Sequence, residues 1–113
     1  MIKVDNMDKL KTFLEKSGYK FYKNYIDRGF DWYACKRSES KRECTSNEKP
    51  VQIVVTPHKY VHGSISQTSV EIDLTAEFNG QWWQLKAYSL APVDAIKNLD
   101  MIEASLVKAW EAL

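Results

Sequence analysis

Residues 69–90 read SVEIDLTAEFNGQWWQLKAYSL, and this stretch decides the fold. In its first half apolar side chains alternate with polar ones as far as Asn79-Gly80. Strict alternation is typical of a strand with one buried face. Asn-Gly between two such runs favours a two-residue type I′ turn, because both turn positions need a positive φ. The stretch therefore predicts a β-hairpin closed between Phe78 and Gln81.

The turn also predicts which side chains share a face of the hairpin. The core face is expected to pair Ala76 with Trp83, Leu74 with Leu85, and Ile72 with Ala87. The opposite face is expected to pair Glu77 with Trp82, Thr75 with Gln84, Asp73 with Lys86, and Glu71 with Tyr88. This second face is half aromatic and half charged, so it is the first place to look for a binding surface.

The segments before the hairpin predict one helix and three further strands. Residues 6–17 have the apolar spacing of an amphipathic helix, with Gly18 where a C-terminal cap belongs. Aromatic and β-branched residues predict strands at 19–25, 30–35 and 51–56. Pro57 should confine any continuation of the third strand to an edge or an irregular stretch. The polar run 38–50 is expected to form a loop.

Residues 92–113 carry apolar side chains at steps of three and four and predict a C-terminal helix. A capping-box pattern at Asp100 allows two helices that meet there. We therefore expect an α+β fold, an antiparallel sheet of about five strands flanked by an N-terminal helix and a C-terminal helix or helix pair. A chain of 113 residues suits a single domain over residues 1–113.

Composition narrows the classes of function. The net charge is +1, so no strong field draws the chain to nucleic acid or to an anionic membrane. The first residues lack the pattern of a signal peptide, and no apolar run approaches the ~20 residues of a membrane span. We expect a cytosolic protein that does not contact membranes.

Cys35, Cys44, His58 and His62 form the spacing C-x8-C-x13-H-x3-H. Structural zinc sites usually draw their cysteines from a knuckle two to four residues apart. The cysteines here are too widely spaced for such a knuckle, so we expect free thiols, no bound metal and no cofactor.

The chain has no motif of a known catalytic class. It lacks G-x-S-x-G, H-E-x-x-H, a P-loop and G-x-G-x-x-G. Glu71, Asp73 and Glu77 share a strand face and could act as paired carboxylates, but solvated outer-face residues are the more usual explanation. We expect no enzymatic activity and assign no catalytic residue.

Two binding hypotheses remain, and the first is protein binding. Four Trp, six Tyr and four Phe exceed what one small core is expected to hide, and Trp and Tyr are common interface hot spots. A protein partner or a second copy of the chain is therefore expected on one sheet face, through Trp82, Tyr88, Tyr33, Glu71, Asp73 and Lys86.

The alternative is nucleic-acid binding through a basic loop, assisted by sheet aromatics. Its candidate residues are Lys36, Arg37, Lys41, Arg42 and Lys49. Glu39, Glu43 and Glu48 interleave with these cations and cancel much of their charge, whereas phosphate binding relies on unopposed positive charge. Protein binding is therefore the preferred hypothesis.

A group of short motifs suggests a relationship. They are Trp32-Tyr33, Lys36-Arg37, Cys44, Asn47-Glu48-Lys49-Pro50, Asn79-Gly80, Trp82, Leu85-Lys86, Tyr88-Ser89, Ala109-Trp110 and Ala112-Leu113. Over about residues 30–113 this pattern resembles small uncharacterised proteins of tailed bacteriophages and prophages. The chain departs from that pattern at Ser46, where those proteins tend to carry a second Cys. The resemblance implies an accessory protein in the cytoplasm of a bacterial host, and it brings no catalytic residues.

Overall fold

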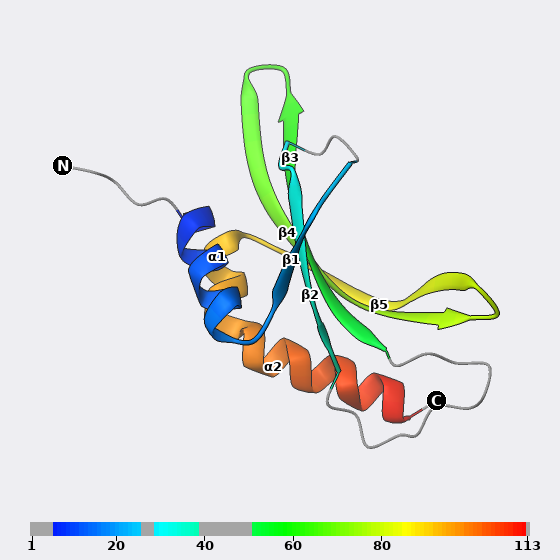
Figure 1. The fold of residues 1–113 in the computed structure, drawn as a ribbon. Coiled ribbons are helices and arrows are strands. Elements are labelled where there is room, and N and C mark those ends of the chain that lie inside the picture. Colours follow the sequence, from blue (N-terminus) through cyan, green and yellow to red (C-terminus); the bar gives the residue numbers. More distant parts are fainter. Residues whose placement is uncertain (1–5, 26–28, 39–50, 113) are drawn as a thin grey trace.

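The computed structural model describes residues 6–25, 29–38 and 51–112. These residues form two helices and five strands (Figure 1). In chain order the elements are α1 (Asn6–Lys16), β1 (Lys20–Lys23), β2 (Trp32–Arg37), β3 (Gln52–His62), β4 (Ile65–Phe78), β5 (Gln81–Leu90) and α2 (Pro92–Glu111). The strands make one antiparallel sheet in the order β1-β2-β3-β4-β5. The predicted α+β architecture is confirmed.

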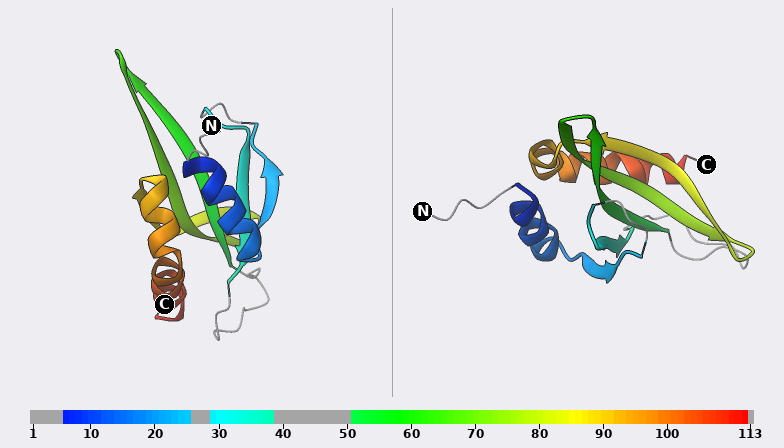
Figure 2. Two further views of the ribbon diagram at one scale, coloured as in Figure 1. Left: turned by 90° about the vertical axis from the view of Figure 1, so that its left-hand side faces the viewer. Right: turned by 90° about the horizontal axis from the view of Figure 1, so that it is seen from above.

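Both helices pack on the same face of the sheet (Figure 2). Alternate residues of the central strands point toward them, among them Ile53 and Val55 of β3 and Ile72 and Leu74 of β4, all essentially inaccessible to solvent. The helices supply the other half of the core through Leu10, Leu14, Ala95, Leu99, Ile102, Leu106 and Trp110. The opposite face of the sheet is not covered by either helix.

The C-terminal segment is one continuous helix, not two. Pro92 occupies its first turn, as the sequence predicts. The capping-box pattern at Asp100 does not interrupt it, because Leu99 and Ile102 on either side of Asp100 are both buried in the core. A helix break there would turn part of this apolar stripe away from the sheet.

β3 continues through Pro57, which pairs with Val70 of β4. On the other side of β3, β2 pairs only with the residues from Gln52 to Val55. Pro57 therefore lies in a part of β3 that forms an edge of the sheet, where a missing backbone N–H is tolerated. This is one of the two outcomes that the sequence allowed.

The hairpin turn is confirmed, and the predicted pairing holds next to it. Asn79 has φ 51° and Gly80 φ 82°, as a type I′ turn requires. The pairs Phe78–Gln81, Glu77–Trp82, Ala76–Trp83 and Thr75–Gln84 form as expected.

Beyond Thr75 the predicted register is wrong by one residue. A β-bulge leaves Leu85 unpaired, so that Leu74 pairs with Lys86, Asp73 with Ala87, Ile72 with Tyr88, and Glu71 with Ser89. A bulge of this kind places two residues of one strand opposite one residue of the other and shifts every later pair. Tyr88 consequently belongs to the core face, where it packs against the hydrophobic cluster with Leu85 and Leu90.

Trp110 and Trp32, not Trp83, are the tryptophans of the described core. Trp83 does lie on the same side as Ala76, but 52% of it is exposed, because the end of the β4–β5 hairpin projects beyond the end of α2 (Figure 2). Trp110 is only 1% exposed. The expectation that Trp83 is a core residue is therefore corrected.

The turn makes a first prediction. Asn79→Ala and Gly80→Ala should each lower the free energy of unfolding, by about 1–2 kcal/mol, because a β-carbon disfavours the left-handed conformation. A β-carbon at Gly80 would meet no neighbouring atom within 4 Å, so the cost there is one of backbone conformation alone. Asn79→Gly is the matched control and should melt close to the wild type. Equal melting temperatures for all three variants would contradict the turn.

The core makes a second prediction. Trp110→Ala should lower the free energy of unfolding by about 3–5 kcal/mol, because it removes a fully buried aromatic side chain and leaves a cavity. Trp83→Ala, measured by urea denaturation in parallel at low protein concentration, should cost much less. The reverse order would show that the hairpin packs differently from the structure.

Candidate functional site

The sheet face opposite the helices carries a shallow hollow to which all five strands contribute. Its volume is about 450 Å³. The lining residues are Tyr22 of β1, Tyr33 and Cys35 of β2, Gln52 and Val54 of β3, Thr75 of β4 and Trp82 of β5. The pairing registers place these side chains on one face, because Tyr22 pairs with Tyr33, Cys35 with Val54, and Gln52 with Thr75.

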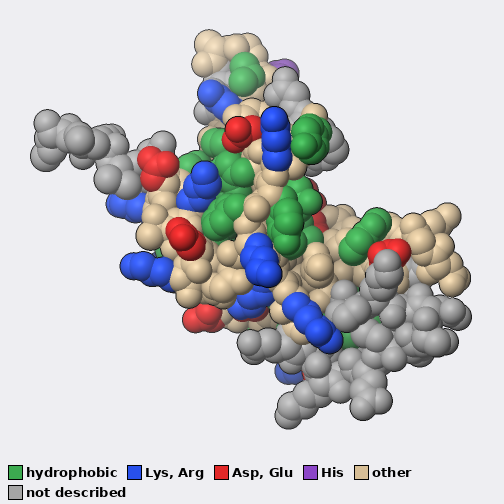
Figure 3. All heavy atoms as spheres, in the orientation of Figure 1, with side chains coloured by type: hydrophobic (Ala, Val, Ile, Leu, Met, Phe, Trp, Pro, Cys, Tyr) green, Lys and Arg blue, Asp and Glu red, His purple; other side chains and the backbone are tan. Residues whose placement is uncertain are grey.

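Aromatic rings form the walls of this hollow. Tyr22 and Tyr33 stack with their ring centroids 5.5 Å apart and their planes at 22°, as expected for directly opposed residues on neighbouring strands. Tyr22 is 45% exposed and Trp82 57% exposed. Figure 3 shows hydrophobic side chains gathered over β1 and β2, with Lys and Arg side chains beside them.

The floor of the hollow is uncharged. Burial raises the pKa of the Cys35 thiol, although its hydrogen bond with Tyr22 and the nearby Lys20 charge act in the opposite direction. Cys35 is a free, buried thiol and stays neutral at physiological pH. Charged residues stand at the margin instead, since Lys20 pairs with Cys35, Arg37 with Gln52, and Glu77 with Trp82.

A polar cluster adjoins the hollow beside Thr75. The Thr75 hydroxyl donates to Asp73 Oδ1 at 2.6 Å, and Gln84 Nε2 donates to both Asp73 Oδ2 at 3.0 Å and Glu71 Oε1 at 2.6 Å. His58 Nε2 lies 3.4 Å from Glu71 Oε2. Asp73 is only 7% exposed. Burial raises the pKa of Asp73, and the neighbouring Glu71 carboxyl raises it further, while the hydrogen bonds from Thr75 and Gln84 act against the shift.

The structure brings together four of the six residues proposed for partner binding. Tyr33 and Trp82 line the hollow, and Glu71 and Asp73 lie beside it on the same face. Tyr88 and Lys86 are displaced by the bulge. The Tyr88 hydroxyl is 2.7 Å from Ser105 Oγ on α2, and the Lys86 ammonium lies over the Tyr88 ring, so the expected Asp73–Lys86 pair does not form.

Reasoning from the sequence missed Tyr22, Cys35, Gln52 and Val54, which complete the hollow. The sequence predicted their strands, with a short turn joining 19–25 to 30–35, but not the pairing of β2 with β3 that places them together. The sequence did contain one signal for this site. Tyr22 and Tyr33 lie on two strands joined by a short turn, and tyrosines placed in this way can stack across the strand pair.

The residues of the nucleic-acid alternative do not share a surface in the described part of the chain. Lys36 points to the helix side, where its Nζ lies 3.1 Å from Glu103 Oε2. Arg37, the next residue of β2, points to the open face. Lys41, Arg42 and Lys49 lie outside the described residues.

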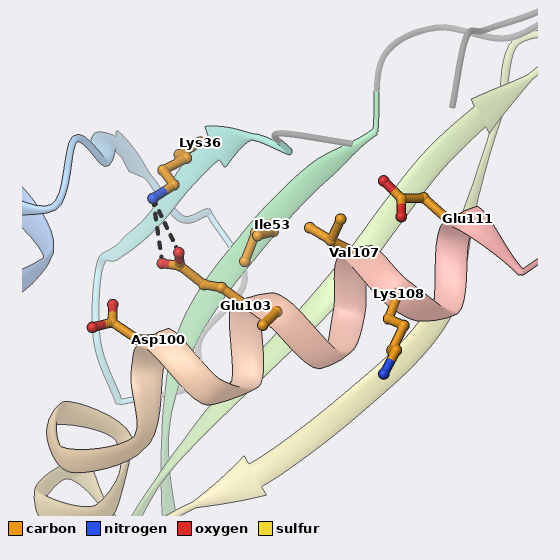
Figure 4. A pocket seen from close by; sticks show the side chains of 8 residues that line it. Lys36, Ile53, Asp100, Glu103, Val107, Lys108 and Glu111 are labelled. Carbon is orange, nitrogen blue, oxygen red and sulfur yellow. Dashed lines mark hydrogen bonds and ion pairs between the residues drawn. The ribbon is translucent and has the colours of Figure 1, made fainter. Parts of the chain in front are cut away.

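A second cleft of about 500 Å³ lies between α2 and the ends of β2 and β3 (Figure 4). In Figure 4 Glu103 reaches across from α2 toward Lys36. Glu103 also accepts a hydrogen bond from the Tyr19 hydroxyl at 2.8 Å, and Lys36 donates to the Ser17 carbonyl at 3.2 Å. Burial, with the Glu103 charge, strongly raises the pKa of Tyr19, which therefore remains a donor. This network joins the end of α1, β2 and α2, so its polar groups hold the fold together.

The metal-site residues named from the sequence are scattered or undescribed. Cys35 lies on β2, while His58 and His62 lie four residues apart on β3, and Cys44 is outside the described residues. No group of three or more His, Cys, Asp or Glu side chains in the described ranges could hold a metal ion. Neither of the two described helices is long and apolar enough to cross a bilayer.

Comparison with known proteins finds no match to a family model, to a curated protein or to a solved structure.

The buried carboxyl makes a third prediction. Because the pKa of Asp73 is raised in the folded state above the ordinary 3.8, the folded protein holds this proton more tightly than the unfolded chain does. Its stabilising contribution is complete below pH 3.8 and is lost as the pH rises through the folded-state pKa. Asp73→Asn cannot ionise, so its stability relative to the wild type should rise between pH 4 and 7.

Urea denaturation of both proteins across that range measures the effect. Asp31→Asn, at an exposed position, is the control and should unfold at nearly the same urea concentration as the wild type. A wild type that gains stability over Asp73→Asn as the pH rises would contradict the assignment.

Proposed function

We propose that this protein is a non-enzymatic protein-interaction module that binds a partner protein through the hollow on the open face of its sheet. The observation that carries the proposal is the distribution of charge. The described lining of the hollow contains no charged side chain, whereas Lys20, Arg37 and Glu77 stand around it. Protein interfaces have this anatomy, an aromatic core depleted of charge within a polar rim.

The residue types in the hollow support a protein partner. Tyr and Trp are the most frequent hot-spot residues, because each supplies a large contact area for few rotatable bonds. Tyr22 and Tyr33 are already stacked on each other, so binding orders fewer side chains than it would for isolated rings.

The carboxylates beside the hollow support a structural role more than a catalytic one. Glu71 and Asp73 both accept hydrogen bonds from Gln84, and Asp73 also accepts one from Thr75. These contacts tie β4 to β5 next to Trp82 and hold that wall of the hollow in place. These hydrogen bonds are therefore made within the sheet, to side chains of β4 and β5.

The resemblance to small proteins of tailed bacteriophages and prophages suggests where such a module acts. An accessory phage protein would meet its partner in the cytoplasm of the bacterial host. The partner class is then a protein of the host or of the phage itself.

The fourth prediction tests the hollow. Immobilised wild-type protein should retain a specific partner from bacterial lysate, and Tyr33→Ala and Trp82→Ala should each weaken that binding by about 2 kcal/mol, the loss typical of a hot spot. Binding is quantified by calorimetry once mass spectrometry has identified the retained protein.

Two exposed apolar residues of α2 offer matched controls. Val93→Ala and Met101→Ala remove exposed apolar surface on the helix side and should leave the affinity unchanged. A partner retained equally by all four variants would contradict the assignment of the surface. Retention that is abolished by nuclease would support nucleic-acid binding instead.

A further inference from the structure

The outer edge of β5 is an open strand edge near the hairpin turn. β5 is the last strand of the sheet, and among the described residues it pairs with β4 alone. Trp82 and Trp83 point to opposite faces of this strand, and each is more than half exposed. Near the turn, β5 therefore exposes an aromatic side chain on each face of the sheet as well as its outer backbone edge.

The turn determines which backbone groups face outward. A hairpin closed by the bond between the Phe78 carbonyl and the Gln81 N–H makes these two residues a hydrogen-bonded pair. Hydrogen-bonded and non-hydrogen-bonded pairs alternate along an antiparallel ladder. The backbone N–H and C=O groups of Trp82 and Gln84 thus point away from β4. These N–H and C=O groups are spaced two residues apart, so a second extended strand can form hydrogen bonds with them.

The other edges of the sheet carry devices that discourage strand addition, and this segment of β5 carries none. β1 is only four residues long and has Lys20 and Lys23 at its ends. The part of β3 beyond its pairing with β2 contains Pro57 and Lys59. Short edges, lysines and prolines are the usual protection against unwanted pairing. From Gln81 to Gln84, β5 has no charge, no Pro and no Gly, and the bulge at Leu85 and then Lys86 follow.

We propose that a second copy of this chain pairs with this edge, antiparallel, about a two-fold axis at Trp83. The backbone N–H and C=O of Trp82 in each copy then bond to the C=O and N–H of Gln84 in the other copy. Four backbone hydrogen bonds form in this way. Gln81 pairs with Leu85 of the second copy, and Trp83 pairs with Trp83. All five positions pair uncharged side chains, which is why the segment complements itself.

The central pair is the favourable one. Trp83 is a non-hydrogen-bonded position in the new ladder, where opposed Cα atoms approach to about 4.5 Å and side chains contact closely. Cross-strand aromatic pairs are among the stabilising combinations in sheets. The hairpin end projects beyond the described end of α2 (Figure 1).

This dimer goes beyond the proposed function, because it uses the β5 backbone and Trp83 on the helix side. Wild-type protein in sedimentation equilibrium should show a concentration-dependent monomer–dimer equilibrium. Trp83→Lys should weaken dimerisation by about 30-fold or more, because it removes the central hot spot and places two like charges opposite each other. Met101→Lys, at an exposed apolar position of α2, is the matched control and should dimerise as the wild type does.

A charge-pair experiment tests the register itself. Trp83→Lys and Trp83→Glu should each be monomeric, and an equal mixture of the two should form heterodimers, because the opposite charges then face each other on the axis. Hydrogen exchange supplies a second readout. The amides of Trp82 and Gln84 should be protected in the dimer and exchange quickly in Trp83→Lys, whereas the Trp83 amide, which bonds to β4, should be protected in both.

A monomeric wild type, a Trp83→Lys variant that still dimerises, or a mixture that does not associate would each overturn the proposal. Failure of this proposal is distinguishable from failure of the proposed function. Tyr33→Ala should dimerise normally while it loses the partner, and Trp83→Lys should bind the partner as a monomer. Circular dichroism confirms that each variant is folded before either comparison is made.

Discussion

The alternation of side chains along β3 and β4 is the constraint on which the rest of the structure depends. Ile53, Val55, Ile72 and Leu74 are buried against the helices. Because successive residues of a strand point to opposite faces, the residues between them must face the other way. The two helices both pack on this one face of the sheet. The open face, with its hollow, is therefore a direct consequence of how the core is built.

The alternation of side chains does not by itself explain two partly or fully buried charged residues, Lys36 and Asp73. Lys36 shares a face with core residues of β2, and its charge is compensated there by Glu103 at 3.1 Å. Asp73 lies on the open face and yet is buried, and Gln84 and Thr75 supply its hydrogen bonds. Buried charged or polar groups are tolerated when they find such partners. The first contact joins β2 to α2, and the second joins the neighbouring strands β4 and β5, so they also position the walls of the two clefts.

Local sequence patterns predicted the helices and strands well. They did not predict features that depend on the whole fold, such as strand order and the exposure of individual side chains. The Asn79-Gly80 turn and the apolar spacing of residues 92–113 are local signals, and both correspond to observed elements. The bulge at Leu85 carried a weaker signal. Leu85, Tyr88 and Leu90 all pack on the core, at steps of three and then two, and a step of three within a strand indicates an extra residue.

The candidate site was predicted in part for the same reason. Alternation assigned Trp82 and Thr75 to one face, but the exposure of Trp83 depends on how far the hairpin extends beyond α2. The hollow also needed the order of β1, β2 and β3 in the sheet, which places Tyr22 and Cys35 beside Val54. Strand order and helix coverage are properties of the whole fold, and no short window of sequence contains them.

The two proposals together have a geometric consequence. A two-fold axis that pairs Trp83 with Trp83 on one face of both sheets runs perpendicular to the sheet, so the two open faces must lie on the same side of the dimer. Each Trp82 then stands next to the axis, and the two hollows flank it within one continuous surface. A partner that is itself dimeric or carries a repeated motif could occupy both hollows at once. The second contact would be intramolecular, and its effective concentration would raise the avidity without any new residue in either hollow. Dimerisation at the β5 edge would in that way strengthen binding at Tyr33, although Tyr33 itself takes no part in the dimer contact.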